Sequence, residues 1–132
     1  MAAPTQSERI IEIETPLGKD VLLLRSFTGH ETLGRLFCFN LDMLSTQSDV
    51  SFDDIVGQNV TVRLTLQGGG DRYFNGFINS FAQTGVGRKG TEHYSIYEAT
   101  MVPWFWFLTR TADCRIFQEK TVPDIIKMIF SE

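Results

Sequence analysis

The stretch that decides the fold is NVTVRLTLQGGGDRYFNGFINSFAQ, Asn59 to Gln83. Its first part alternates between apolar and polar residues, which is typical of a β-strand with one buried face. The apolar positions are Val60, Val62, Leu64 and Leu66. The run GGGD then predicts a turn, after which residues 72–83 resume a strand pattern. Because a glycine inside a strand often marks an irregularity, we expect a bulge or bend at Gly76.

The same alternation recurs on both sides of this stretch. It is found in the segments Arg9–Glu14, Val21–Phe27, Arg35–Leu44 and His93–Val102. Pro16 and Gly18 separate the first two segments and predict a turn, and hence a hairpin. In the third segment, the face predicted to be buried carries Phe37, Phe39, Leu41 and Met43. Turns at this spacing predict a mainly β protein with minor α content, a small antiparallel β-barrel of about six or seven strands.

Two segments carry helix signals instead. Ser51 as N-cap and Gly57 as exit predict one or two helical turns between them. In TVPDIIKMIF, residues 121–130, Thr121 is a suitable N-cap and Pro123 falls in the first turn. No glycine or proline exit follows, so we expect the chain to be cut within this segment. The predicted organisation is a β-barrel over residues 1–103, then an aromatic junction and the start of a helical segment over 104–132.

The composition is that of one ordinary globular domain. The chain has 132 residues, of which 42% are hydrophobic and 21% charged, which allows one modest core. Its 12 Lys and Arg against 16 Asp and Glu give a net charge of -4. Proteins that bind nucleic acids through phosphates need clustered Lys and Arg, so we expect no nucleic-acid partner.

The sequence also bears on the cellular compartment. Cys38 and Cys114 show no disulfide framework, so we expect free thiols in a reducing compartment. The N-terminal residues show no secretory signal peptide, and no apolar run approaches the roughly 18 residues that span a bilayer. We therefore expect a soluble protein made in the cytoplasm. If it is exported, the route does not read an N-terminal signal.

Two patterns suggest a cofactor or a metal but lack the required context. GVGRKG, residues 85–90, matches the glycine fingerprint of dinucleotide-binding proteins. That fingerprint needs a strand before it and a helix after it, whereas both neighbours here resemble strands, so we predict a hairpin tip. His30 and His93 are the only histidines and belong to no metal-ligand spacing. We expect no cofactor and no metal.

The segment VPWFWFLTRTADCRIF, residues 102–117, has two readings. In one, Cys114 is a nucleophile with His93 as its base and Asp113 as a third partner. In the other, Cys114 is a small hydrophobe, and Trp104 and Trp106 belong to an apolar plug between the β region and the terminal helix.

Four segments resemble the N-terminal region of the VgrG family, the spike proteins of bacterial type VI secretion systems. They are RSFTGHETLGRLFCFNLDMLS (25–45), DDIVGQNVTVRLTL (53–66), RYFNGFINSF (72–81) and PWFWFLTRTADCRIFQEKTVPDII (103–126). The resemblance runs from about Ile11 to Phe130. Departures are mild: Gly34 stands where the family usually has Ser, and Met101, Phe105 and Phe107 stand where Leu is common. The larger departure is length, because the family's spike continues for several hundred residues.

The resemblance implies a phage baseplate-hub-like region without catalytic activity. In that family, three chains form a pseudo-hexameric ring that seats the spike on the tube of Hcp protein and helps to deliver effectors. The implied partners are therefore other copies in a homotrimer, the Hcp tube, and effector or adaptor proteins. The implied localisation is the bacterial cytoplasm during assembly, followed by secretion through the type VI system.

Ten residues are then expected to pack in the core or at an interface. They are Phe37, Phe39, Tyr73, Phe74, Gly76, Pro103, Trp104, Trp106, Cys114 and Phe117. Two alternatives stay open from the residues alone: a stand-alone hub-like binding or adaptor domain, and a Cys-dependent enzyme.

Overall fold

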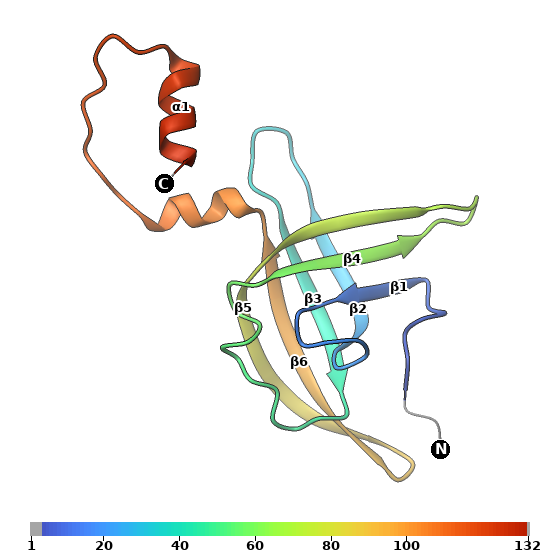
Figure 1. Cartoon of the computed structure of the whole chain (residues 1–132). Coiled ribbons are helices and arrows are strands. Elements are labelled where there is room, and N and C mark those ends of the chain that lie inside the picture. Colours follow the sequence, from blue (N-terminus) through green and yellow to red (C-terminus); the bar gives the residue numbers. More distant parts are fainter. Residues whose placement is uncertain (1–3, 132) are drawn as a thin grey trace.

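The computed structural model describes residues 4–131, which form one antiparallel sheet followed by two helical segments (Figure 1). The strands are β1 (Ile11–Glu14), β2 (Leu23–His30), β3 (Cys38–Ser45), β4 (Asn59–Thr65), β5 (Asp71–Lys89) and β6 (Glu92–Val102). The helical segments are the 3₁₀ helix η1 (Trp104–Arg110) and the α-helix α1 (Val122–Phe130). Within residues 4–131, neither helical segment has the length and hydrophobicity of a membrane-spanning helix.

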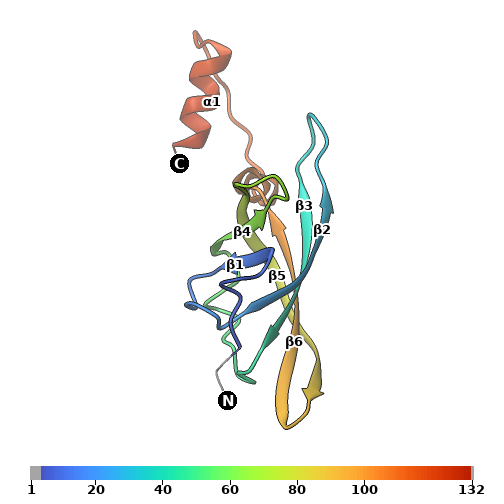
Figure 2. The same ribbon diagram turned by 90° about the vertical axis from the view of Figure 1, so that its right-hand side faces the viewer.

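The six strands are ordered β1-β4-β5-β6-β3-β2, and each neighbouring pair is antiparallel. The long strand β5 pairs with β4 over its first part and with β6 over its second. The sheet curls into a half-barrel that brings its two edge strands, β1 and β2, toward one another (Figures 1 and 2). The prediction of a small, mainly β antiparallel fold is confirmed.

The core fills the concave side of this sheet. Tyr97 and Met101 of β6 and Val62 of β4 are fully buried. The Tyr97 ring stacks on Phe81 with the ring centroids 5.0 Å apart. The apolar face predicted for Arg35–Leu44 is confirmed, because its residues in β3 are buried. These are Phe39, Leu41 and Met43.

The predicted hairpin between the first two strands is wrong. The turn itself forms: Gly18 has φ +107° and its N–H donates to the Thr15 carbonyl at 3.3 Å. However, β1 pairs with β4 and β2 pairs with β3. The pairing with β4 sets Ile13 opposite Val62 in the core, a long-range contact that turn residues alone do not specify.

Residues 51–57 form a single hydrogen-bonded turn, the shorter of the two lengths predicted. The Val56 N–H donates to the Phe52 carbonyl at 2.9 Å, and Gly57 has φ +79°. The backbone then turns to β5, because the Gly57 N–H donates to the Ile78 carbonyl at 2.7 Å. Because this bond joins Gly57 to β5, the segment does not continue into a second helical turn.

The hairpin tip predicted at residues 85–90 is shorter than expected. Strand β5 continues to Lys89, and the reversal occurs at Gly90, which has φ +64°. GVGRKG thus belongs to a β5–β6 hairpin, as predicted, but residues 85–89 are part of the strand and only Gly90 lies at the tip. Its first two glycines, Gly85 and Gly87, belong to the strand.

The C-terminal arm, defined here as residues 104–130, lies outside the half-barrel (Figures 1 and 2). Phe107 of η1 contacts Phe77 of β5, with ring centroids 5.5 Å apart. Helix α1 begins as predicted: the Thr121 side chain accepts a hydrogen bond from the Asp124 N–H. Neither η1 nor α1 contains a buried residue, so the arm is an appendage to the core.

Candidate functional site

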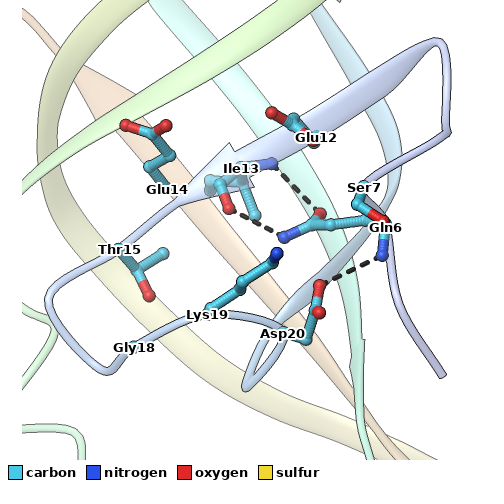
Figure 3. A pocket seen from close by; sticks show the side chains of 9 residues that line it. All are labelled: Gln6, Ser7, Glu12, Ile13, Glu14, Thr15, Gly18, Lys19 and Asp20. Carbon is cyan, nitrogen blue, oxygen red and sulfur yellow. Dashed lines mark hydrogen bonds between the residues drawn. The ribbon is translucent and has the colours of Figure 1, made fainter. Parts of the chain in front are cut away.

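The seam between the edge strands β1 and β2 is spanned by one buried side chain, Gln6, which is 5% exposed. Its Nε2 donates to the Ile13 carbonyl of β1 at 2.8 Å (Figure 3). It also donates to the Leu22 carbonyl, just before β2, at 3.2 Å. Its Oε1 accepts from the Ile13 N–H at 3.1 Å and from the Leu24 N–H of β2 at 3.3 Å. Every hydrogen-bonding position of the amide is occupied, so Gln6 is a structural residue that joins the two edges.

Asp20 holds the backbone of the same N-terminal segment. It accepts from the Gln6 N–H at 3.0 Å and from the Thr5 hydroxyl at 2.8 Å. These bonds, the Gln6 N–H first, hold the pKa of the Asp20 carboxyl below its ordinary value because they stabilise the ionised form. Asp20 itself has φ +60°, a left-handed conformation that Asp tolerates better than most residues.

A hollow of about 470 Å³ lies against this seam (Figure 3). It is lined by Gln6, Ser7, Glu12, Ile13, Glu14, Thr15, Gly18, Lys19 and Asp20. Its lining contains carboxylates and one lysine but no histidine or cysteine. Across residues 4–131, the structure shows no group of three His, Cys, Asp or Glu side chains placed to hold a metal ion. The hollow therefore contains no cysteine–histidine pair.

One carboxylate of the hollow belongs to an ion-pair network. The Arg63 guanidinium of β4 donates to Glu12 of β1 at 2.6 Å and to Asp71 of β5 at 3.1 Å. The bond from Arg63 lowers the pKa of Glu12. Bonds from Thr65 and then Arg63 lower the pKa of Asp71. Because these charges lie across three neighbouring strands and satisfy one another, their role is cross-strand pairing.

The predicted residues that belong to the barrel fall into two groups. Phe39 is buried, and Phe37 and Phe74 pack against the core at the same end of the sheet. Tyr73 is 61% exposed because its side chain points to the opposite face of β5 from its neighbour Phe74.

Gly76 is buried in the regular β4–β5 pairing, opposite Val60. The bulge predicted there is wrong, because the irregularities of β5 lie between Ile78 and Ser80 and between Gln83 and Gly85. Gly76 is needed for a close approach instead: a Cβ on it would lie 2.7 Å from both Met101 Cγ and the Val102 carbonyl oxygen.

The predicted residues of the C-terminal arm do not join the core. Trp104 is 45% exposed and contacts Phe130 of α1 with ring centroids 5.5 Å apart. Trp106 is half-buried under the Arg110 guanidinium, 4.2 Å from its ring centroid. Pro103 and Phe117 are also half-buried. A core role is therefore wrong for Trp104, and the interface role remains a prediction.

Cys114 is exposed, and both cysteines are free. A buried position for Cys114 is wrong, because it follows η1 in the loop that leads to α1, away from the sheet. His93 sits near the start of β6, and η1 begins just beyond the end of that strand. The β5–β6 hairpin lies at one end of the molecule and the loop between η1 and α1 at the other (Figure 1), so the structure does not bring this histidine to the thiol.

Gln6 could not have been found from the sequence. A single glutamine in a polar N-terminal segment carries no periodic or motif signal, and its role depends on two strands that become neighbours only when the sheet curls. Gly29 was also missed. A Cβ there would lie 2.3 Å from Phe39 Cδ1, a contact between β2 and β3 that only the register of the strands creates.

Comparison with known proteins gives a consistent set of relatives. A sequence model of the phage tail baseplate hub (GPD) family matches residues 30–132. The type VI secretion system spike protein VgrG1a of Pseudomonas aeruginosa is 41% identical over 125 residues, which are 95% of this chain and 19% of that protein. VgrG1c of the same organism is 40% identical over 128 residues, 97% of this chain and 17% of that protein. The chain thus spans about a fifth of the length of these relatives.

A solved structure has the same fold. It is that of the E. coli c3393 protein, described as a component of the type VI secretion system with structural similarity to the T4 bacteriophage tail proteins gp27 and gp5. The TM-score is 0.72 at 21% identity, and the match covers 92% of this chain and 32% of that one.

Proposed function

Because the chain belongs to the phage tail baseplate hub (GPD) family, we propose that it is the beginning of the hub of a type VI secretion spike. The observation that carries this proposal is the similarity to VgrG spike proteins at about 40% identity over nearly the whole chain. On this proposal the chain acts as a structural component. Its partners are two further copies, the Hcp tube ring on which the hub sits, and an effector or adaptor protein.

The exposed apolar surface of the C-terminal arm supports an assembly role. Ile116 is 88% exposed, Val122 69%, and Trp104 and Phe130 each 45%. Apolar side chains gathered on one exposed segment are unusual for a protein that works alone and typical of a surface that another part or chain covers. On this proposal, residues 1–103 supply the barrel of the ring, and residues 104–132 supply the junction to the remainder of the hub.

The proposal also includes a location. A hub of this kind is assembled in the bacterial cytoplasm and leaves with the secretion machine, so its export needs no N-terminal signal. The polar segment Pro4–Arg9 is used in the fold itself, since Gln6 joins β1 to β2.

The experiment measures Hcp in the culture medium of the bacterium that makes this protein. An in-frame deletion of the codons for residues 4–131 should abolish Hcp export, and the intact gene should restore it. The control for Trp104→Ala is Val86→Ala, because both side chains are exposed but Val86 lies in β5 and only Trp104 lies on the arm. We expect Trp104→Ala to lower export and Val86→Ala to leave it unchanged.

Each result has a distinct meaning. Normal export from the deletion strain would overturn the proposed function. Reduced export by the deletion together with normal export by Trp104→Ala would retain the function and refute the role of the arm.

A further inference from the structure

The edge strand β1 is held very differently on its two sides. On one side it is paired with β4 over its whole length, from Ile11 to Glu14. On the other side, the described hydrogen bonds that reach its backbone come from the Gln6 side chain. The link across the seam is thus one amide group, and not a ladder of backbone bonds.

The amide acts as a substitute for a strand. It bonds both the N–H and the carbonyl of Ile13, as a paired residue of a neighbouring strand would, and on its other face it bonds Leu22 and Leu24. Removing it leaves four backbone groups at the seam without these partners, and unpaired buried backbone groups are strongly disfavoured.

The segment that carries Gln6 is itself held by few contacts. Its backbone is held at Asp20, which accepts from the Gln6 N–H. On the other side of Gln6, the Arg9 guanidinium donates to the Leu24 carbonyl at a long 3.4 Å. No strand pairing includes residues 4–9, and the first backbone bond to β4 is that of the Ile10 carbonyl, which accepts from the Thr65 N–H at 2.8 Å. The segment up to Arg9 can therefore leave the seam without breaking the sheet.

We propose that Pro4–Arg9 is a cooperative opening unit, in which Gln6 acts as a latch that holds the β1–β2 seam of the half-barrel closed. When the latch is released, the seam amides of Ile13 and Leu24 lose their acceptor together, while all six strands of the sheet, β1 included, stay paired. The opened seam exposes two unpaired strand edges, of the kind that binds extended peptide segments through the backbone.

Amide hydrogen exchange on the 132-residue chain tests this directly. In the unaltered protein, we expect the Ile13 and Leu24 amides to exchange through an opening that depends little on urea. The amides of β6, which has a partner strand on each side, should exchange only through an opening that exposes much more surface and depends strongly on urea. Equal urea dependence for both sets would overturn the proposal without any mutation.

The variant Gln6→Leu then identifies the latch. We expect it to raise exchange at Ile13 and Leu24 by at least about tenfold, still through an opening that depends little on urea. The β6 amides should rise by no more than the same factor, because a less stable closed state also lowers the free energy of global unfolding. The matched control is Ser7→Ala, the exposed neighbouring residue, which should change neither set. Unchanged exchange at Ile13 and Leu24 would show that their opening does not break the Gln6 bonds, and the proposal would be wrong. Should Gln6→Leu fail to fold, the urea dependence of the unaltered chain still decides.

Discussion

The substitution Gly76→Ala tests whether the close packing of β5 against β6 determines the stability of the half-barrel. The added Cβ would lie 2.7 Å from Met101 Cγ and 2.7 Å from the Val102 carbonyl oxygen. The Met101 side chain can rotate away, although it is fully buried. The Val102 carbonyl belongs to the backbone of β6 and cannot move without shifting the strand.

The expected cost follows from this geometry. Forcing an extra methyl group into a packed site usually costs about 1–3 kcal/mol. Alanine also reduces the conformational entropy of the unfolded chain, which stabilises the folded state by only about 0.4–1 kcal/mol. We therefore expect Gly76→Ala to lower the free energy of unfolding by roughly 1–2 kcal/mol, the difference between these terms.

Gly85→Ala is a matched control in the same strand. There, the nearest atom to the added Cβ is Ile96 Cδ1 at 3.8 Å, an ordinary van der Waals contact. We expect this variant to be neutral or slightly stabilising. Urea unfolding followed by circular dichroism gives both free energies, provided that the slope with denaturant is unchanged. Equal stability of the two variants would refute the assignment of Gly76 to a close backbone approach.

Two further predictions concern a core hydroxyl and an acid-sensitive contact. Tyr97→Phe should raise the free energy of unfolding, by up to about 1–3 kcal/mol, because the Tyr97 hydroxyl is buried without a hydrogen-bond partner among the described residues; a lower value in urea unfolding would contradict this. The pKa of Asp20 in the folded state lies below its ordinary value of 3.8. The Asp20 carboxylate therefore adds to the free energy of unfolding above about pH 3.8, and this stabilisation is lost as the pH falls through the folded-state pKa. The stability difference between the native chain and Asp20→Asn should therefore shrink in acid unfolding below about pH 4, and a difference independent of pH would contradict the role of the ionised carboxylate.

The elements that local signals specify were predictable from the sequence. Alternation in Arg35–Leu44 identified the buried face of β3, and the cap at Thr121 identified the start of α1. These patterns succeed because a strand with one buried face and a capped helix are each defined by residues a few positions apart. The resemblance to a known family supplied the hub-like fold, which alternation and turn spacing alone leave as one of several barrels or sandwiches.

The pairing of the strands could not be predicted in the same way. The turn at Gly18 forms as expected, yet β1 pairs with β4, about 50 residues away along the chain. Local turn chemistry cannot distinguish a hairpin from a strand that leaves to pair elsewhere, since the choice depends on which partner buries Ile13. The role of Gln6 depends in turn on that choice, because the seam it spans exists only once β1 lies at one edge of the sheet and β2 at the other.

The difference between Phe39 and Trp104 shows what decides the role of an aromatic residue in this chain. Both belong to segments that resemble the same family, and both were expected to pack in a core or at an interface. Phe39 lies in β3, which has a partner strand on each side, so the sheet itself buries the ring to 4% exposure. Trp104 lies just past the last strand, where Phe130 covers only part of its ring. Since buried apolar surface stabilises by about 25 cal/mol per Å², the surface of Trp104 that stays in water contributes to binding only when another surface covers it. Substitution of Phe39 should therefore impair folding, whereas substitution of Trp104 should impair assembly while the barrel stays folded.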